Sequence, residues 1–295
     1  MIDLMDRPLV LDGGLSTELE SRGHDISGTL WSAQLLLDAP DAVVDAHRAF
    51  LDAGADIVTT ASYQASAEGF SRAGIPFATG QELIRRSVEL ARRAVEESGR
   101  EALVAGSVGP YGAMLANGAE YTGDYGSVGV DELRDFHRPR LELLAEAGVD
   151  VLAVETIPSL AEVEALLAEL DRLGHPAWLS LTTDGLLTRR GEPAGEAFSM
   201  ATSVSSVIAV GVNCTDPSGV GLAVDLAVEF GGKPGVVYPN SGEGWDAVHR
   251  AWLPASQGLL LGDVDGWLRS GARIVGGCCR VTPDQIRSIA DVVRP

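Results

Sequence analysis

The chain has 295 residues, of which 45% are hydrophobic, and it carries a formal net charge of −20 with a sequence pI of about 4.5. This hydrophobic content supports a large core, and barrels of alternating strands and helices often reach this length. The acidic balance excludes the basic surface that binding to nucleic acid or to anionic lipid would need. We therefore expect small-molecule substrates as partners, with no nucleic acid and no membrane.

The start of the chain and its cysteines bear on where the protein works. The first residues, MIDLMDRPLV, lack the apolar region of a signal peptide, and no run of about 18 apolar residues follows. Three cysteines, an odd number, fit poorly with a secreted disulfide scaffold. The sequence predicts a cytoplasmic protein with reduced thiols. It leaves the oligomeric state open, and a monomer is our expectation.

Eight short apolar runs, each bounded by glycine or polar residues, are typical of buried parallel strands. They cover residues 8–14, 56–63, 102–110, 150–156, 177–182, 207–214, 235–240 and 272–279. Amphipathic patterns lie between most of these runs. They are clearest over residues 82–99 and 131–148, where apolar positions recur at intervals of three and four and predict helices.

A short phrase recurs where predicted helices pass into strands. Residues 53–60, 147–154 and 270–277 each place a glycine where a helix would end. Strands that alternate with helices without a linker predict an α/β fold, a single (β/α)8 TIM barrel domain over residues 1–295. The alternative is a doubly wound open sheet. Its dinucleotide-binding version would need G-x-G-x-x-G after the first strand, where this chain has DGGLSTELE (12–20).

Two connections depart from this regular pattern. Residues 109–129 are long for a link between a strand and a helix, which predicts either a lid or binding loop or a plain surface excursion. Residues 183–196, after the fifth strand, give only a weak helical pattern. The sequence leaves the role of both loops open.

Polar and sulfur-bearing side chains lie at the carboxyl ends of the predicted strands, where barrel enzymes place their active sites. They are Asp12, Thr60, Ser62, Glu155, Asn213, Cys214, Asn240, Cys278 and Cys279. All three cysteines of the chain are therefore expected on one rim of the barrel.

Three thiolates from Cys214, Cys278 and Cys279 suit zinc and leave the fourth tetrahedral position for a substrate. Neighbouring residues on a strand point to opposite faces, so both members of the pair reach one ion only if the chain leaves the pleat. Gly276 and Gly277 make that departure sterically easy. The alternatives are cysteines that act as small buried hydrophobic residues, or a redox pair, although adjacent cysteines lack C-x-x-C spacing.

The charge of such a site predicts its chemistry. A zinc ion with three thiolates has a net charge of −1 and is a poor Lewis acid for activating water. It suits a thiol, because coordination removes the thiol proton, whereas a free thiol with a pKa of about 8.5 is only a few per cent ionised at neutral pH. The open position thus predicts a substrate thiolate that attacks an electrophilic carbon.

Two acidic residues on the same rim, Asp12 and Glu155, could hold a substrate ammonium group. Other interpretations are open for both. Asp12 precedes glycine and fits a turn carboxylate, while Glu155 fits a carboxylate at the N-terminus of a helix that begins near Pro158.

Backbone amides after the first strand could bind a substrate carboxylate. Gly13 and Gly14 leave their amides accessible at the start of a predicted helix. The spacing of Thr17 and Glu20 in that helix is typical of a capping box.

Nine motifs, in order along nearly the whole chain, carry a family resemblance. They are LDGGLSTELE (11–20), TTASYQAS (59–66), GSVGPYGA (106–113), EYTGDY (120–125), FHRPR (136–140), VETIPSLAEVEAL (154–166), GVNC (211–214), VVYPNSGE (236–243) and GGCCR (276–280). With these motifs the chain resembles the zinc-dependent homocysteine S-methyltransferases, and it is closest to the branch that uses S-methylmethionine.

The resemblance implies a TIM barrel that moves a methyl group from a sulfonium donor, S-methylmethionine or S-adenosylmethionine, to the zinc-bound thiolate of L-homocysteine, which forms methionine. It implies Cys214, Cys278 and Cys279 as ligands of Zn2+. It also implies Asp12 and Glu155 around the amino group of homocysteine. The further substrate-binding residues that it implies are Gly13, Gly14, Thr60, Ser62 and Asn213.

The chain departs from the family pattern after the fifth strand. The family often has an S-D-G-T-like stretch there, where this sequence has LLTRRGEPAG (186–195), so donor contacts from this loop are open. Little sequence follows the last predicted helix. We expect neither the C-terminal extension of betaine-using relatives nor the cobalamin and folate modules of large methionine synthases.

Other residues and functions complete these expectations. Tyr111, Tyr121 and Tyr125 could offer aromatic faces to a sulfonium, or be ordinary loop tyrosines. His137 lies in a helical pattern, and we expect a structural role for it. The competing functions are the same chemistry with selenocysteine as acceptor or betaine as donor, and a non-catalytic barrel that binds zinc or thiols.

Overall fold

The fold comes from a computed structural model that describes residues 2, 4, 6–26, 31–246, 251–253 and 261–294. Among these residues, eight parallel strands form one sheet in the order β1-β12-β9-β8-β5-β4-β3-β2. The strands are β1 (Leu9–Val10), β2 (Ile57–Thr59), β3 (Leu103–Val108), β4 (Val151–Ile157), β5 (Ala177–Leu181), β8 (Val207–Asn213), β9 (Gly235–Tyr238) and β12 (Ala272–Val275). A parallel bridge between Leu11 and Ile57 joins the two outer strands, so the sheet closes into a barrel. The predicted (β/α)8 fold is confirmed.

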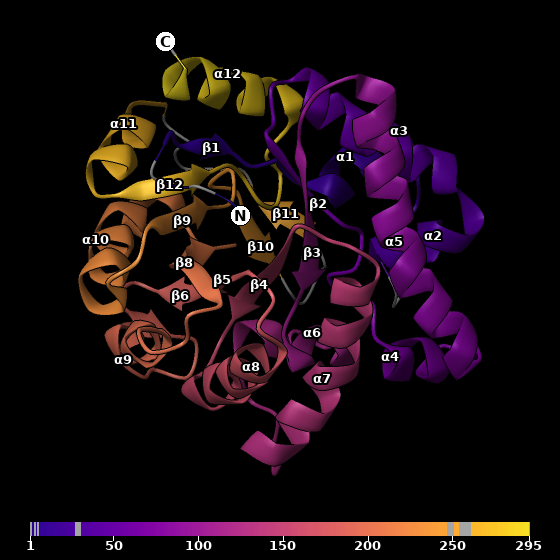
Figure 1. Cartoon of the computed structure of the whole chain (residues 1–295), viewed down its shortest axis with the longest axis horizontal. Coiled ribbons are helices and arrows are strands. Elements are labelled where there is room, and N and C mark those ends of the chain that lie inside the picture. The colour runs from indigo at the N-terminus through magenta and orange to yellow at the C-terminus, as the bar shows by residue number, and fades with distance from the viewer. Residues whose placement is uncertain are drawn as a thin grey trace.

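Helices surround this barrel (Figure 1). They are α1 (Leu15–Ser21), α2 (Leu35–Asp38), α3 (Pro40–Asp52), α4 (Ala67–Arg72), α5 (Phe77–Ser98), α6 (Tyr111–Leu115), α7 (Val130–Glu146), α8 (Leu160–Leu173), α9 (Ala194–Ala201), α10 (Val220–Gly231), α11 (Leu261–Arg269) and α12 (Pro283–Val293). The predicted helices at 82–99 and 131–148 correspond to α5 and α7. The recurring glycines Gly54, Gly148 and Gly271 have φ of +105°, +87° and +100°, which confirms that they turn the chain from helix to strand.

Alternation along the strands divides the apolar residues between two sides of the sheet. One cluster fills the barrel interior, and the larger cluster packs between the strands and the helices. The interior cluster contains Leu4, Leu11, Ile57, Ala105, Val151, Ala153, Trp178, Ala209, Val236, Tyr238 and Ile274. The barrel is therefore a packed core that leaves its chemistry to the rim.

Several strands end earlier than their apolar runs predict. The runs 8–14, 56–63 and 272–279 yield strands that end at Val10, Thr59 and Val275. The polar residues that close these runs lie in the loops immediately after the strands, so their backbone is free to turn across the rim.

In the described part of the chain, two antiparallel pairs of strands stand apart from the barrel sheet. The first pairs β6 (Thr183–Asp184) with β7 (Leu187–Thr188), and the second pairs β10 (Gly244–Asp246) with β11 (Ala251–Leu253). The weakly patterned stretch 183–196 is thus a hairpin that leads into α9, which has only eight residues.

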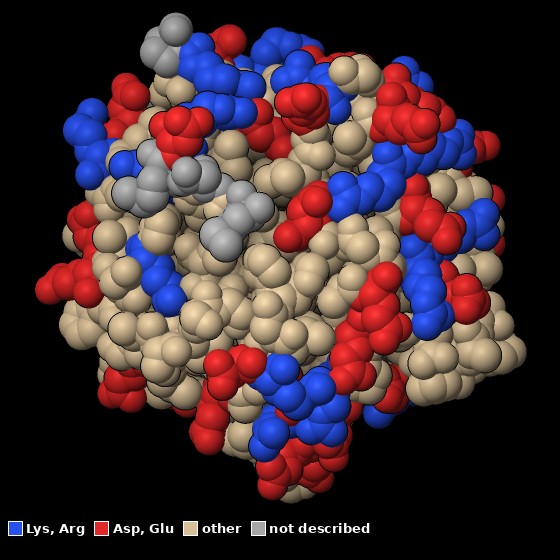
Figure 2. Space-filling view, viewed as in Figure 1, with Lys and Arg blue, Asp and Glu red and all other residues tan. Residues whose placement is uncertain are grey.

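Charged side chains of both signs lie on the surface (Figure 2). On the face shown in Figure 2, acidic and basic side chains intermingle around the outer ring of helices, while the centre is mostly uncharged. Among the described residues, the helices are all too short or too polar to cross a membrane.

Candidate active site

The three cysteines meet at the carboxyl end of the barrel. Their sulfur atoms lie within 4.8 Å of one another, and Cys214 Sγ is 3.7 Å from Cys279 Sγ. Tetrahedral ligands with Zn–S bonds of about 2.3 Å would be about 3.8 Å apart. In the described part of the chain, no other group of cysteine, histidine or acidic residues has such spacing. The cluster therefore fits one tetrahedral ion.

Backbone hydrogen bonds between loops set the positions of these sulfurs. Cys214 follows β8 in the left-handed region, with a φ of +49°. The amide of Cys278 donates to Pro239 O at 2.8 Å, and the amide of Ser241 donates to Cys279 O at 3.1 Å. The loop after β9 thus holds Cys278 and Cys279, and neither cysteine lies in a regular strand.

Gly276 and Gly277 are required for close packing. A Cβ on Gly276 would lie 2.7 Å from Leu11 O, and one on Gly277 would lie 2.2 Å from Val281 Cγ1. Neither glycine has a positive φ; the residue of this turn that does is Arg280, at +66°. The predicted departure from the pleat therefore occurs, but the glycines contribute by close packing, Gly276 against the end of β1 and Gly277 against Val281.

The variant Gly276→Ala should lower the free energy of unfolding by about 1–3 kcal/mol, because its methyl group would press on the backbone after β1. The shift should also separate the thiols and lower the bound metal per chain. Urea denaturation and metal analysis would measure both effects. Gly221→Ala, whose methyl group would meet no atom within 4 Å, is the matched control. Unchanged stability and metal content in Gly276→Ala would contradict this account.

Contacts among the thiols make their ionisation unequal. Hydrogen bonds from Cys278 and Cys279 hold the pKa of the Cys214 thiol well below its usual value, with smaller contributions from Tyr121 and Arg189. The same contacts with Cys214 raise the pKa of Cys278 and of Cys279. The thiols thus differ in how easily they ionise, and a bound cation would favour the ionised form of all three. This donor set fits a metal ion that prefers sulfur.

Asp12 follows β1 and is buried at the mouth of the barrel. Its Oδ2 accepts a hydrogen bond from Thr59 N at 2.7 Å, and its Oδ1 accepts one from Thr59 Oγ1 at 2.5 Å. Burial outweighs these bonds and raises the pKa of Asp12 to about 7. A substrate ammonium beside the carboxyl would favour its ionised form.

Glu155 is the second buried acid at the mouth. Its Oε1 accepts a hydrogen bond from Ser107 Oγ, the hydroxyl of Tyr238 also contacts it, and burial raises its pKa to about 7. The alternative of a helix-terminal carboxylate is wrong, because β4 continues to Ile157 and α8 begins only at Leu160.

Ser107 and Tyr238 contact Glu155 in the candidate site, and the sequence reasoning missed both. Both lie in motifs of the family resemblance, but their contact with Glu155 depends on strand register, which the motifs do not reveal. Trp178 Nε1 donates to the Tyr238 hydroxyl at 2.9 Å, so this hydroxyl is free to donate its own hydrogen to Glu155.

Thr60 and Ser62 act on the same carboxylate through Ser107. Their hydroxyl oxygens are 2.7 Å apart. Thr60 Oγ1 accepts from Ser107 N at 3.0 Å, while Ser62 Oγ donates to Ser107 O at 2.8 Å. Both hydroxyls therefore clamp the residue that donates to Glu155.

Asn213 joins β8 to the residue after Glu155. Its Oδ1 accepts from Thr156 N at 2.7 Å, and its Nδ2 donates to Thr156 Oγ1 at 2.8 Å. Thr156 has a φ of +61°, an uncommon conformation for a β-branched residue. The amide of Asn213 holds this turn while its neighbour Cys214 joins the thiol cluster.

The glycines after β1 differ in what they can offer. The amide of Gly14 donates to Val281 O at 2.9 Å, so it is not available to a substrate carboxylate. Of the two predicted amides, that of Gly13, one residue earlier in the same turn, remains the candidate. The predicted capping box is wrong. Gly14 caps α1 without a side-chain bond, and Thr17 Oγ1 instead accepts from Arg280 N at 3.0 Å, which ties α1 to the cysteine loop.

The connection 109–129 folds over the rim through α6 and a short 3-10 turn (Ala119–Tyr121). The Tyr121 hydroxyl lies 3.3 Å from Cys214 Sγ. Tyr111 and Tyr125 pack together, with ring centroids 5.2 Å apart, so they support the loop. Of the three tyrosines considered for sulfonium contact, Tyr121 is the one beside the thiols.

A buried polar network anchors this loop to α7 and α8. The carboxylate of Glu162 accepts hydrogen bonds from Tyr111 N at 2.6 Å and from the Tyr125 hydroxyl at 2.7 Å. It also lies 2.8 Å from His137 Nε2. Arg140 Nη2 lies 2.7 Å from His137 Nδ1, and burial lowers the pKa of His137 to about 4. The imidazole is therefore neutral and structural.

Removing the centre of this network should destabilise the protein. Glu162→Ala should lower the free energy of unfolding by about 3 kcal/mol, because the buried donors of Tyr111, Tyr125 and His137 lose their acceptor. Tyr125→Phe removes one donor and should cost about 1 kcal/mol. Urea denaturation would rank the variants, with the exposed Glu164→Ala as control. A loss for Glu162→Ala no larger than that of the control would contradict the assignment.

Arg189 is a basic residue whose charge acts on Cys214, and the sequence reasoning missed it. It follows the β6–β7 hairpin, and its Nε donates to Thr182 Oγ1 at 3.2 Å. Thr182 Oγ1 in turn donates to Cys214 O at 3.2 Å. The guanidinium carbon lies 6.0 Å from the centre of the Tyr121 ring.

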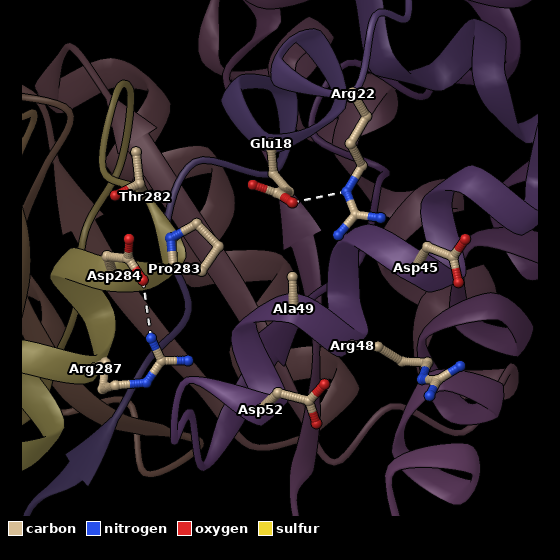
Figure 3. Close-up of a pocket in the computed structure, with 10 residues that line it drawn as sticks. All are labelled: Glu18, Arg22, Asp45, Arg48, Ala49, Asp52, Thr282, Pro283, Asp284 and Arg287. Carbon is tan, nitrogen blue, oxygen red and sulfur yellow. Dashed lines mark hydrogen bonds and ion pairs between the residues drawn. The ribbon is translucent and has the colours of Figure 1, made fainter.

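A separate hollow of about 690 Å³ lies between α1, α3 and α12 (Figure 3). Its lining residues are Glu18, Arg22, Asp45, Arg48, Ala49, Asp52, Thr282, Pro283, Asp284 and Arg287. Glu18 pairs with Arg22 at 2.7 Å, and Asp284 pairs with Arg287 at 2.8 Å. None of the lining residues belongs to the thiol cluster, so this hollow is apart from the candidate site.

The family model for homocysteine S-methyltransferase matches residues 9–293. The chain belongs to this family. The family resemblance inferred from the motifs is therefore confirmed.

Similarity to individual proteins agrees with this family match. The chain is 42% identical to a selenocysteine methyltransferase of Astragalus bisulcatus, over 97% of this chain and 93% of the relative. It is 41% identical to homocysteine S-methyltransferase 3 of Arabidopsis thaliana, over 96% and 89%. The crystal structure of the homocysteine methyltransferase MmuM from Escherichia coli, metallated form, matches with a TM-score of 0.86 and 38% identity, over 97% and 96%. The chain is a methyltransferase enzyme.

Proposed function

We propose that this methyltransferase moves a methyl group from S-methylmethionine to L-homocysteine and forms methionine with the help of Zn2+ held by Cys214, Cys278 and Cys279. The observation that carries the proposal is the thiol cluster at the barrel mouth, with all sulfurs within 4.8 Å. The metallated state named for the MmuM structure supports a metal in this family. Zinc is the choice that the all-sulfur donor set favours.

Two buried acids favour an amino acid as the acceptor. Asp12 and Glu155 have pKa values raised to about 7, and a substrate ammonium would stabilise both carboxylates. Thr59 orients the first, while Ser107 and Tyr238 orient the second. The chain thereby offers homocysteine an anionic seat for its amino group close to the thiol cluster.

The chemistry follows from charge and position. Bound zinc would supply a cation that lets the homocysteine sulfur lose its proton and remain a thiolate at neutral pH. The sulfur attacks the donor methyl carbon while the carbon–sulfur bond of the sulfonium breaks, and the electron pair stays on the departing methionine sulfur. Because opposite charges cancel in this step, excluding water favours it. Tyr121 and the rest of the connection 109–129, which Glu162 anchors, lie beside the thiols and would help to exclude water.

A methyl-transfer assay tests the proposal against its alternatives. Metal-replete enzyme would receive homocysteine or selenocysteine with S-methylmethionine, S-adenosylmethionine or betaine, and bound metal would be quantified. We expect homocysteine with S-methylmethionine to give the highest kcat/KM. A preference for selenocysteine would move the acceptor toward that named for the Astragalus relative. Bound zinc without transfer from any donor would favour the non-catalytic barrel and overturn the proposal.

A further inference from the structure

A positive charge lies at the mouth of the thiol site, where a cationic donor must approach. Arg189 is half-buried, and its charge acts on Cys214. In the described part of the chain it makes one hydrogen bond, from Nε to Thr182, and no ion pair. Its two terminal nitrogens are therefore available, while Nε fixes the side chain.

This placement is unfavourable for a bare sulfonium ion. Like charges repel, and the guanidinium already lies over the ring of Tyr121, at 6.0 Å from its centre, where cation–π attraction would otherwise draw the donor. The same guanidinium fork matches a carboxylate with two parallel hydrogen bonds. An arginine here therefore suits a donor that carries its own carboxylate.

The sequence around Arg189 departs from the stretch that the family often has. It lies in LLTRRGEPAG (186–195), where the family often has an S-D-G-T-like stretch. Two arginines thus occur where that stretch is polar and acidic. The neighbour, Arg190, points elsewhere: its Nη1 lies 3.5 Å from Asp124 Oδ1, and its stem packs on Gly123.

We propose that Arg189 binds the carboxylate of the methyl donor and so selects amino-acid sulfonium compounds over sulfonium compounds without a carboxylate. This inference rests on the proposed methyl transfer and specifies which part of the donor the β6–β7 hairpin recognises. Thr182 anchors the guanidinium, and Tyr121 supports its face.

The donor rather than homocysteine is the partner of Arg189 because of where the acceptor's amino group lies. The carboxylate and ammonium of an amino acid share one carbon, so both must lie near Asp12 and Glu155 when the ammonium is held there. Glu155 takes its contacts from Ser107 on β3 and Tyr238 on β9, whereas Arg189 is held by Thr182 after β5. The acceptor carboxylate therefore lies away from Arg189.

The test compares Arg189→Met and Arg189→Lys with Arg190→Met as the matched control. Two donors would be used: S-methylmethionine, and its decarboxylated analogue, 3-aminopropyl dimethylsulfonium. We expect Arg189→Met to raise the KM for S-methylmethionine by about 10–100-fold, the loss typical of a charge-assisted pair. The KM for homocysteine should change less than about twofold, and the preference for the carboxylated donor should vanish. Arg189→Lys should keep part of the preference for the carboxylated donor, and Arg190→Met should behave as the wild type.

Calorimetric binding of S-methylmethionine to the metal-replete proteins gives a readout that does not need turnover. Weaker binding by Arg189→Met and not by Arg190→Met supports the inference even if homocysteine proves to be the wrong acceptor. An increased KM for homocysteine with an unchanged donor KM would overturn it, as would unchanged donor binding. If wild-type enzyme binds the donor but transfers no methyl group, the proposed function fails separately. Should Arg189→Met not fold, Arg189→Lys decides by the same comparison.

Discussion

Replacing Cys278 by serine should remove the bound metal and lower kcat/KM for methyl transfer by at least about 100-fold. Even the outer partners of metal ligands cost about 10–100-fold when they are mutated, and a ligand should cost more. Serine keeps the size of the side chain, but its hydroxyl is a poorer ligand than a thiolate for a metal that prefers sulfur. Cys214→Ser and Cys279→Ser should give the same result, because the three sulfurs form one cluster.

Metal content and methionine formation should be measured on the same samples. Urea denaturation provides the control for folding, since the backbone of Cys278 is held by Pro239 O whatever its side chain. Wild-type enzyme stripped with a chelator should lose activity and regain it when Zn2+ is restored, while Cys278→Ser should not regain it. Methionine formation that survives both the substitution and the chelator would rule out the metal mechanism.

The barrel could be predicted because its signals are local. Eight apolar runs, the helical periodicity between them and the glycines at helix ends each concern only a few consecutive residues. The ends of the strands were harder to predict from the sequence. The run at 272–279 continues to two cysteines, yet β12 ends at Val275, because the backbone from Gly277 onward bonds to the loops after β1 and β9. Apolar composition shows what is buried, but not where strand pairing stops.

The site was predictable to the extent that position at a strand end brings residues together. Cys214, Cys278 and Cys279 converge because their strands are parallel and share a rim. The contacts of Glu155 with Ser107 and Tyr238 depend on register and rotamer across three strands, which sequence alone does not give. Arg189 was missed for a different reason. Its hairpin has no strong pattern and departs from the family, so only the fold brings it beside Tyr121.

The pH dependence of homocysteine binding should reveal the buried acids. Burial raises the pKa of Asp12 and of Glu155 to about 7, and the ionised forms are the ones that attract an ammonium group. As pH falls through 7 the carboxyls of the free enzyme take up protons, so kcat/KM for homocysteine should fall toward acid pH. Above that range both are ionised and the value should level off. Saturating homocysteine should move the acid limb of kcat to lower pH, because the bound ammonium favours the carboxylates.

Glu155→Gln separates this effect from ionisation of the substrate thiol, which releases a proton in wild type and variant alike. The neutral amide should lower kcat/KM for homocysteine about 10–100-fold at pH 8, the loss expected for a charge-assisted hydrogen bond. With one titrating carboxyl fewer, the acid limb of its profile should also be shallower than that of wild type. Glu164→Gln, an exposed glutamate on α8, is the control and should reproduce the wild-type profile. An acid limb of equal steepness in Glu155→Gln would show that Glu155 does not titrate in this range, and its ammonium contact would then have to be abandoned.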